Sequence, residues 1–258
     1  MSGRVKSLIR RLQGVSPTGG PPARRAAASF MEVERAERVF YLDYIREGMT
    51  VFDAGANVGE LTLLFSRFAG RAGRVHAFEP SREGFERLSA VCRAASLLNV
   101  TPNRLALAES EGAVRLNVYD GEYLSWTTRA ARPLEDYGIA VRPVAVEEAP
   151  ATTVALYCER HDIREIDLLK IDVEGAELQV MIGAEGLLRD KRVRCLTFEF
   201  GQTTFDMGNS PEAIEAFLEG VGYEVRNLVP GDPAFPGRES AQAALYSMHL
   251  AVPKGVRS

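Results

Sequence analysis

Carboxylate side chains follow three separate runs of apolar residues in this 258-residue chain. Asp53, Glu79 and Asp172 each stand where such a run, typical of a short buried strand, gives way to a turn. In an open parallel sheet, ligands bind outside the carboxyl ends of the strands, so we expect the three acids to converge. Carboxylates gathered in one site can accept hydrogen bonds from hydroxyl or ammonium groups and can remove a proton from a substrate.

The first acid opens a glycine-containing turn, Asp53-Ala-Gly-Ala-Asn-Val-Gly59, which leads into an amphipathic helix. Gly55 and Gly59 let the backbone bend and approach a ligand, and the free N–H groups at the helix start suit a polar ligand. A dinucleotide-binding turn has its second glycine where this chain has Asn57, so the pyrophosphate signature is broken. The Asp53 carboxylate would repel a pyrophosphate but attract an ammonium group, which favours S-adenosylmethionine.

The second acid, Glu79, ends the predicted strand over residues 74–80. A carboxylate there can accept hydrogen bonds from both hydroxyls of a ribose. NAD and S-adenosylmethionine both contain that ribose, so Glu79 does not distinguish between them. An NAD-dependent oxidoreductase therefore stays an alternative interpretation, favoured by the spacing from Gly59 to Glu79 and opposed by Asn57.

A sheet with intervening helices is required to position these residues. Periodicity predicts strands over residues 49–52, 74–80, 101–108, 113–119, 166–171, 193–200, 223–228 and 244–252. It predicts helices over residues 27–47, 60–68, 81–98, 152–162, 176–188 and 211–219. This order indicates an α/β fold whose sheet is parallel with one antiparallel edge.

The amino-terminal part, residues 1–48, differs from the rest as a basic helical and linker extension. Its first thirty residues carry six Lys and Arg and no acid. Apolar spacing predicts a short amphipathic helix within residues 5–12, followed by a Gly/Pro-rich linker over 14–22. Such a helix can cover the site, lie on an anionic membrane, or form a solvated tail.

Residues 49–258 form the expected main domain. Within it, periodicity fails over residues 120–150, a segment that holds the only tryptophan, Trp126, close to Tyr123. We interpret this segment as an insertion that faces the substrate, with Trp126 and Tyr123 as substrate-contacting residues. The alternative is a surface loop with one anchoring aromatic residue.

The composition excludes several classes of protein. The chain is 46% hydrophobic with a net charge of −4, so it is typical of a globular protein without the overall basic field that favours nucleic acid. Three scattered cysteines indicate neither a disulfide framework nor a zinc site, and favour a reducing, cytoplasmic setting. We find no apolar run long enough to span a membrane.

Three sequence blocks resemble the FkbM family of S-adenosylmethionine-dependent methyltransferases. They are Val51-Phe-Asp-Ala-Gly-Ala-Asn-Val-Gly59, His76-Ala-Phe-Glu-Pro80 and Asp167-Leu-Leu-Lys-Ile-Asp-Val-Glu-Gly-Ala-Glu177, of which the last is the most distinctive. The resemblance covers about residues 49–201. It implies a Rossmann-like class I methyltransferase fold, with a mostly parallel seven-stranded sheet, an antiparallel last strand, and helices on both faces. It also implies O-methylation of a hydroxyl on a small acceptor, such as a sugar or secondary metabolite.

The resemblance further assigns residues to the cofactor. It places one group at the methionine and ribose end, namely Asp53, Gly55, Asn57 and Gly59. Glu79, beside Pro80, is expected to bind the ribose hydroxyls, and residues 103–107, which include Ala106, are expected to border the adenine.

The base that removes the acceptor proton is expected to be a carboxylate. Asp172 is the first candidate, and Glu174 and Glu199 are the next. Each has a structural alternative: Asp172 can orient the cofactor ammonium, Glu174 can cap the following helix, and Glu199 can hold a loop.

Two further alternatives concern the metal and the class of protein. Asp172, Glu199 and Gln202 offer hard oxygen ligands for magnesium, but the chain lacks a dense carboxylate motif, so we predict no metal. A protein that keeps the fold and binds a nucleoside without catalysis, or serves as a scaffold, also fits the sequence. The oligomeric state stays open.

Overall fold

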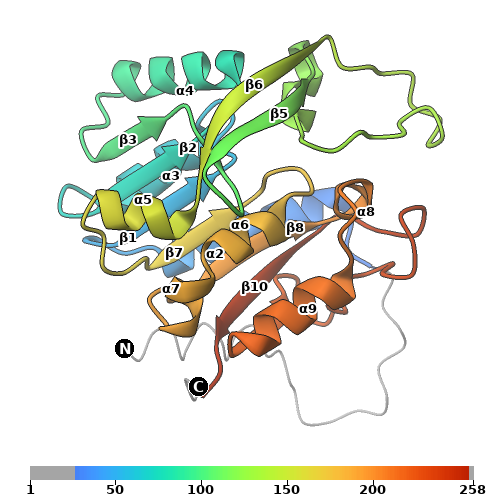
Figure 1. Ribbon diagram of the computed structural model, residues 1–258. Coiled ribbons are helices and arrows are strands. Elements are labelled where there is room, and N and C mark those ends of the chain that lie inside the picture. Colours follow the sequence, from blue (N-terminus) through green and yellow to red (C-terminus); the bar gives the residue numbers. More distant parts are fainter. Residues whose placement is uncertain (1–26, 256–258) are drawn as a thin grey trace.

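A central sheet of seven strands organises the protein (Figure 1). The computed structural model describes residues 27–255. The order across the sheet is β3 (Val100–Asn103), β2 (Arg74–Phe78), β1 (Thr50–Ala54), β7 (Leu168–Ile171), β8 (Leu196–Phe200), β10 (Ser247–Pro253) and β9 (Tyr223–Asn227). The neighbouring pairs from β3 to β8 are all parallel. The mostly parallel seven-stranded sheet predicted from the sequence is therefore confirmed.

The last strand is antiparallel, as predicted, but it does not form the edge of the sheet. β10 pairs antiparallel with both β8 and β9, so it lies between them. After β8 the chain passes through the helix α9 (Pro211–Gly220) and forms β9, which runs in the direction of the parallel strands. This leaves a gap of one strand between β8 and β9. The final strand then fills the gap and satisfies the backbone groups of both neighbours.

Helices cover both faces of the sheet, because successive residues of a strand point to opposite sides. Val51 of β1 packs with α2 (Phe30–Tyr44) and α3 (Glu60–Ala69), and α4 (Arg82–Ala94) lies on the same face. Phe52 faces the opposite side, where α5 (Val154–Arg160), α6 (Glu177–Gly183), α7 (Glu185–Arg189) and α9 pack. The buried strands of a doubly covered sheet are apolar on both faces, which explains why their sequences read as continuous apolar runs.

A second, three-stranded sheet was missed by the sequence analysis. It contains β4 (Ala106–Leu107), β6 (Ala145–Thr152) and β5 (Gly112–Val118) in that order. The strand predicted over residues 101–108 is in fact divided between two sheets, because the chain leaves β3 at Asn103 and enters β4 at Ala106. The segment 120–150 likewise ends in a regular strand, β6, whose alternation is weak because most of its first half is exposed.

Smaller differences concern the helices. The helix predicted over residues 176–188 breaks at Ala184 into α6 and α7. Two short helices were not predicted, the 3-10 helix η1 (Gly121–Trp126) and α8 (Gln202–Asp206). The amphipathic helix predicted within residues 5–12 lies outside the described residues.

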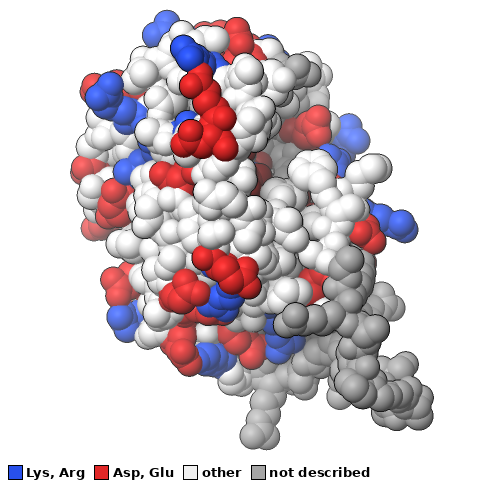
Figure 2. Space-filling view, turned by 90° about the vertical axis from the view of Figure 1, so that its right-hand side faces the viewer, with Lys and Arg blue, Asp and Glu red and all other residues white. Residues whose placement is uncertain are grey.

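Three features of the described residues bear on the predictions made from composition: surface charge, helix length and the state of the cysteines. On the face in Figure 2, acidic and basic side chains are interspersed. Among residues 27–255, no helix is long and apolar enough to cross a membrane. The three cysteines, Cys92, Cys158 and Cys195, are buried and unbonded.

Candidate active site

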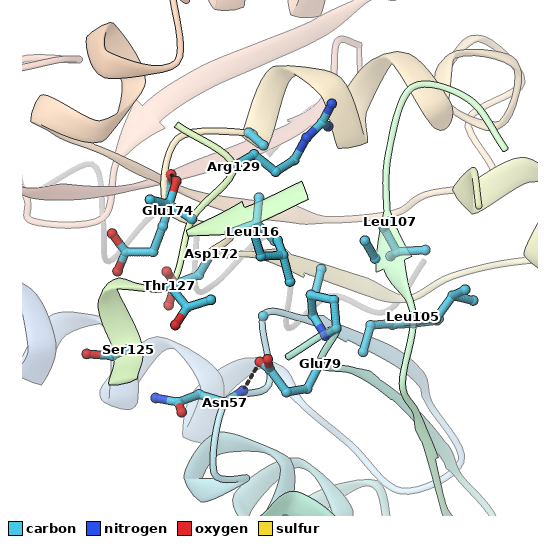
Figure 3. A pocket seen from close by; sticks show the side chains of 18 of the residues that line it. Asn57, Glu79, Leu105, Leu107, Leu116, Ser125, Thr127, Arg129, Asp172 and Glu174 are labelled. Carbon is cyan, nitrogen blue, oxygen red and sulfur yellow. Dashed lines mark hydrogen bonds between the residues drawn. The ribbon is translucent and has the colours of Figure 1, made fainter. Parts of the chain in front are cut away.

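A cavity lies over the carboxyl ends of β1, β2 and β7, where the sequence predicted that the acids would converge (Figure 3). Glu79 and Asp172 both line it, together with Pro80 and Ala106. Figure 3 shows Asp172 and Glu174 on one side and Leu105 and Leu107 on the other, with Glu79 between them. The cavity thus has a carboxylate end and an apolar end, which suits an elongated ligand with one charged and one flat apolar part.

Two residues of the turn after β1 that line the cavity have a left-handed backbone. Gly55 has φ +75°, and a Cβ atom there would lie 1.7 Å from the carbonyl oxygen of Asp172. Asn57 also has a positive φ, 46°, which asparagine tolerates better than most residues. Gly55 and Asn57 line the cavity, while Gly59 caps the start of α3 and does not.

Glu79 forms the floor of the cavity and fixes the turn. Its Oε2 accepts a hydrogen bond of 2.9 Å from the Asn57 backbone N–H (Figure 3). Its Oε1 accepts bonds from the backbone N–H of Ser81, at 3.0 Å, and from the Ser81 hydroxyl, at 2.6 Å. Burial raises the pKa of Glu79, and these hydrogen bonds oppose that shift. The acid therefore links the two loops that follow β1 and β2.

Asp53 does not line the cavity. Its side chain is fully buried, and its Oδ2 accepts a 2.6 Å hydrogen bond from the Thr62 hydroxyl. Its Oδ1 lies 3.1 Å from the Lys170 ammonium, an ion pair rather than a well-aligned hydrogen bond. Asp53 therefore contributes to the site through its contacts with Thr62 and Lys170, and not by lining the cavity.

Lys170 is the residue that the sequence analysis missed. It is 2% exposed, and its Nζ donates to the backbone carbonyls of Gly55, at 2.8 Å, and Ala54, at 3.3 Å. The same ammonium lies 3.4 Å from the Asp172 carboxylate. Burial lowers the pKa of Lys170, but the charges of Asp53 and Asp172 outweigh it and leave the pKa raised. The sequence did contain a signal for this role, a lysine inside the apolar run 166–171, because a lysine is rarely buried without a charged partner.

Three carboxylates meet beside the cofactor turn. Oxygen atoms of Asp172, Glu174 and Glu199 lie within 4.8 Å of one another. Burial, followed by the charges of Glu174 and Asp172, raises the pKa of Glu199 well above its usual value. Burial and then the Asp172 charge also raise the pKa of Glu174. Like charges at such a distance oppose simultaneous ionisation of the three carboxylates.

The loop after β7, which carries Asp172 and Glu174, is held by contacts on two sides. Glu177 is buried, and its Oε1 accepts hydrogen bonds of 3.1 Å from the backbone N–H groups of Val173 and Gly175. Arg132 lies 3.3 Å from Asp206 and 3.9 Å from Glu174. Because Glu174 has a positive φ of 54°, a strained backbone at the site is held by these contacts.

A second cavity of about 390 Å³ adjoins the first. Asp172 and Glu174 line both cavities, whereas Glu199 lines only the second. Trp126 is part of its wall, and Tyr123 packs on the Trp126 ring with centroids 4.9 Å apart without lining either cavity. The structure therefore brings Trp126 to the acids and places Tyr123 behind it.

The first cavity is narrow. Its volume is about 110 Å³, whereas ligand sites usually have about 300–1,000 Å³. Leu124, Ser125, Thr127 and Arg129 line it from η1 and the segment that follows.

The candidate magnesium ligands are only partly brought together. Asp172 and Glu199 are adjacent, and the third acid of the cluster is Glu174. Gln202 lines the same second cavity. These side chains offer oxygen ligands, and the absence of a metal stays a prediction.

The sheet order and the placing of the cavity over the carboxyl ends of β1, β2 and β7 are those of the Rossmann-like class I S-adenosylmethionine-dependent methyltransferases. Residues 53–225 match the family described as Methyltransferase FkbM domain. The chain belongs to this FkbM methyltransferase family, as its sequence blocks predicted.

Two characterised sequences are similar to the chain. One is the 31-O-demethyl-FK506 methyltransferase FkbM of Streptomyces tacrolimicus, 30% identical over 78% of this chain and 81% of that protein. The other is the methyltransferase sdnD of Sordaria araneosa, 28% identical over 68% of this chain and 73% of that protein.

Solved structures are more distant. A methyltransferase FkbM from Methylobacillus flagellatus KT has 14% identity and a TM-score of 0.47, over 96% of this chain and 59% of that chain. A SAM-dependent methyltransferase from Aquifex aeolicus has 16% identity and a TM-score of 0.46, over 95% and 96% of the two chains.

Proposed function

We propose that this methyltransferase transfers a methyl group to a hydroxyl of a small acceptor, such as a sugar or a natural product. The observation that carries the proposal is the carboxylate group Asp172, Glu174 and Glu199, which lies where the two cavities meet. Acceptor and cofactor would meet at that junction. The similarity to the Streptomyces relative, which is named as a methyltransferase of 31-O-demethyl-FK506, supports transfer to oxygen.

The residues of the first cavity fit S-adenosylmethionine. Glu79 would accept hydrogen bonds from the ribose hydroxyls. The Gly55–Asn57 turn would border the methionine part, and glycine is needed at Gly55 because a Cβ atom there would clash with the Asp172 carbonyl. Leu105, Ala106 and Leu107 would border the adenine. The bound cofactor supplies an electrophilic methyl group on a sulfonium.

The protein's own part in the reaction is to hold the hydroxyl and to take its proton. Asp172 is the proposed base: its carboxylate is partly exposed at the junction of the cavities, and the Lys170 ammonium 3.4 Å away holds it in place. Glu199, with its raised pKa, would stay protonated and donate a hydrogen bond to Asp172. In this arrangement one acid of the pair is a base and the other orients it.

Positioning supplies much of the remaining rate. A hydroxyl held near Asp172 at the junction would be oriented toward the methyl group, which converts a bimolecular reaction into an effectively unimolecular one. Exclusion of water by the surrounding side chains would strengthen the electrostatic interactions of the site.

Calorimetric titration with S-adenosylhomocysteine, run beside NAD at the same pH and salt, tests the cofactor. Binding of S-adenosylhomocysteine alone is expected, and binding of NAD alone would point to an oxidoreductase instead. A screen of hydroxylated sugars and natural products with S-adenosylmethionine then tests the reaction. Release of S-adenosylhomocysteine with one of these acceptors supports the proposal, whereas binding without turnover on any of them favours a non-catalytic protein.

A further inference from the structure

The second cavity has more carboxylates than the reaction requires. Glu34 of α2 and Glu199 of β8 line it without lining the first cavity. A base for the acceptor proton needs only one carboxylate, and the sulfonium of the cofactor would face the acids that line both cavities, Asp172 and Glu174. Glu34 is thus left without a role in the proposed reaction, and Glu199 acts there only by orienting Asp172.

Basic side chains do not neutralise these two acids. Arg132 is the one basic residue among the described residues that line the second cavity, and it already pairs with Asp206, 3.3 Å away. Glu34 has only a long, exposed contact of 3.9 Å with Arg38, which is worth little. Glu199 is 7% exposed and forms no ion pair with a described Lys or Arg, so its partner is the Asp172 carboxyl group.

Aromatic rings complete the same cavity. Phe30 and Tyr246 lie together with ring centroids 4.9 Å apart, and Trp126 stands in the wall under the Arg132 guanidinium, 5.3 Å from its ring centroid. Phe30 is 61% exposed, so its apolar surface is available to a ligand. Aromatic faces beside carboxylates attract organic cations, because both the ring quadrupole and the acid favour positive charge.

We propose that the second cavity selects an acceptor that carries an ammonium group as well as the hydroxyl to be methylated. The ammonium lies against Glu34, Glu199 and the aromatic wall, and the hydroxyl reaches Asp172. This inference rests on the proposed function and adds the charge of the acceptor to it.

A matched pair of probes tests the proposal on the full-length protein saturated with S-adenosylhomocysteine. They are trans-4-aminocyclohexanol, which is cationic at neutral pH, and its N-acetyl derivative, which is neutral and has the same ring and hydroxyl. Calorimetry gives the affinities, and the fluorescence of Trp126, the one tryptophan of the chain, reports binding in the cavity. We expect the amine to bind at least about fivefold more tightly than the amide, and this preference to fall as salt is raised.

Two variants locate the effect. Glu34→Gln should reduce the preference for the amine at least about twofold, whereas Glu159→Gln, the same charge change at an exposed residue of α5, should leave it unchanged. Equal affinity for the two probes, no binding of the amine, or an unaltered preference in Glu34→Gln would overturn the inference. Binding of S-adenosylhomocysteine is measured first, so its failure would refute the proposed function separately.

Discussion

Asp53 and Lys170 occupy paired positions on the neighbouring parallel strands β1 and β7, and their charged groups lie 3.1 Å apart with almost no exposure to solvent. The Lys170 ammonium also holds the carbonyl groups that start the cofactor turn and lies beside Asp172. The buried Lys170 ammonium therefore contacts three parts of the site: Asp53 on β1, the cofactor turn, and the proposed catalytic acid Asp172. This arrangement makes the ion pair the first feature to test.

Replacement of Lys170 by methionine should destabilise the protein by about 3–5 kcal/mol, because Asp53 is then left as an uncompensated buried charge. Urea denaturation measures the loss. The double variant Lys170→Met, Asp53→Asn should recover much of it, since the buried charge is then removed. If the double variant is as unstable as the single one, the ion pair is not the cause, and the bonds from Lys170 to the backbone carbonyls of Ala54 and Gly55 are.

Glu79→Gln should weaken binding of S-adenosylhomocysteine by about 1–3 kcal/mol, the range for buried polar groups left with poorer partners. The glutamine amide can accept a hydrogen bond at only one of its two polar atoms, whereas the carboxylate binds at both oxygens. Calorimetry gives the dissociation constants. Glu83→Gln, at a partly exposed residue in the first turn of α4 that does not line the cavity, is the control and should bind as the unmodified protein does. An unchanged dissociation constant for Glu79→Gln would rule out its ribose role.

Asp172→Asn should lower kcat by at least about 100-fold with an acceptor found in the screen, because general-base catalysis typically contributes about 10²–10⁴. The affinity for S-adenosylhomocysteine should change little, which separates loss of the base from loss of the cofactor site. Glu199→Gln serves as the comparison: its amide keeps a donor toward Asp172, so we expect a much smaller fall in kcat. The reverse ranking of the two variants would assign the base to Glu199.

Glu37 gives the protein a pH-dependent stability. It lies on α2, is 5% exposed, and its Oε1 accepts a 2.8 Å hydrogen bond from the Tyr41 hydroxyl. Burial, followed by the charge of Asp172, raises the pKa of Glu37 from 4.5 to about 7. The folded protein therefore binds this proton more tightly than the unfolded chain does.

The sign of the effect follows from linkage. The stabilisation from the Glu37 proton is complete below pH 4.5 and is lost as the pH rises through about 7. Glu37→Gln keeps a hydrogen-bond acceptor for Tyr41 without the ionisation, so it should be more stable than the unmodified protein at pH 8 by about 2 kcal/mol, and nearly equal to it at pH 5. Urea denaturation at both pH values measures the difference. A difference that does not vary with pH would show that Glu37 keeps an ordinary pKa.

Local patterns in the sequence determined much of the fold. The strand, glycine turn and helix over residues 51–69 are recognisable because apolar spacing and the left-handed turn residues act within a few positions. The rule that ligands lie at the carboxyl ends of parallel strands also predicted that Glu79 and Asp172 would lie in one site, as they do. These features need only the order of the elements.

The partner of each buried side chain was decided only by the tertiary structure. Alternation along β1 shows that Asp53 and Phe52 face opposite sides, but it does not indicate that Asp53 faces Lys170 rather than the cofactor. That choice depends on the register between strands more than 110 residues apart in the sequence. The three-stranded sheet, the place of β10 and the raised pKa of Glu199 depend likewise on contacts between distant segments. Pairing and desolvation are set by neighbours in space, which a pattern in one stretch of chain does not contain.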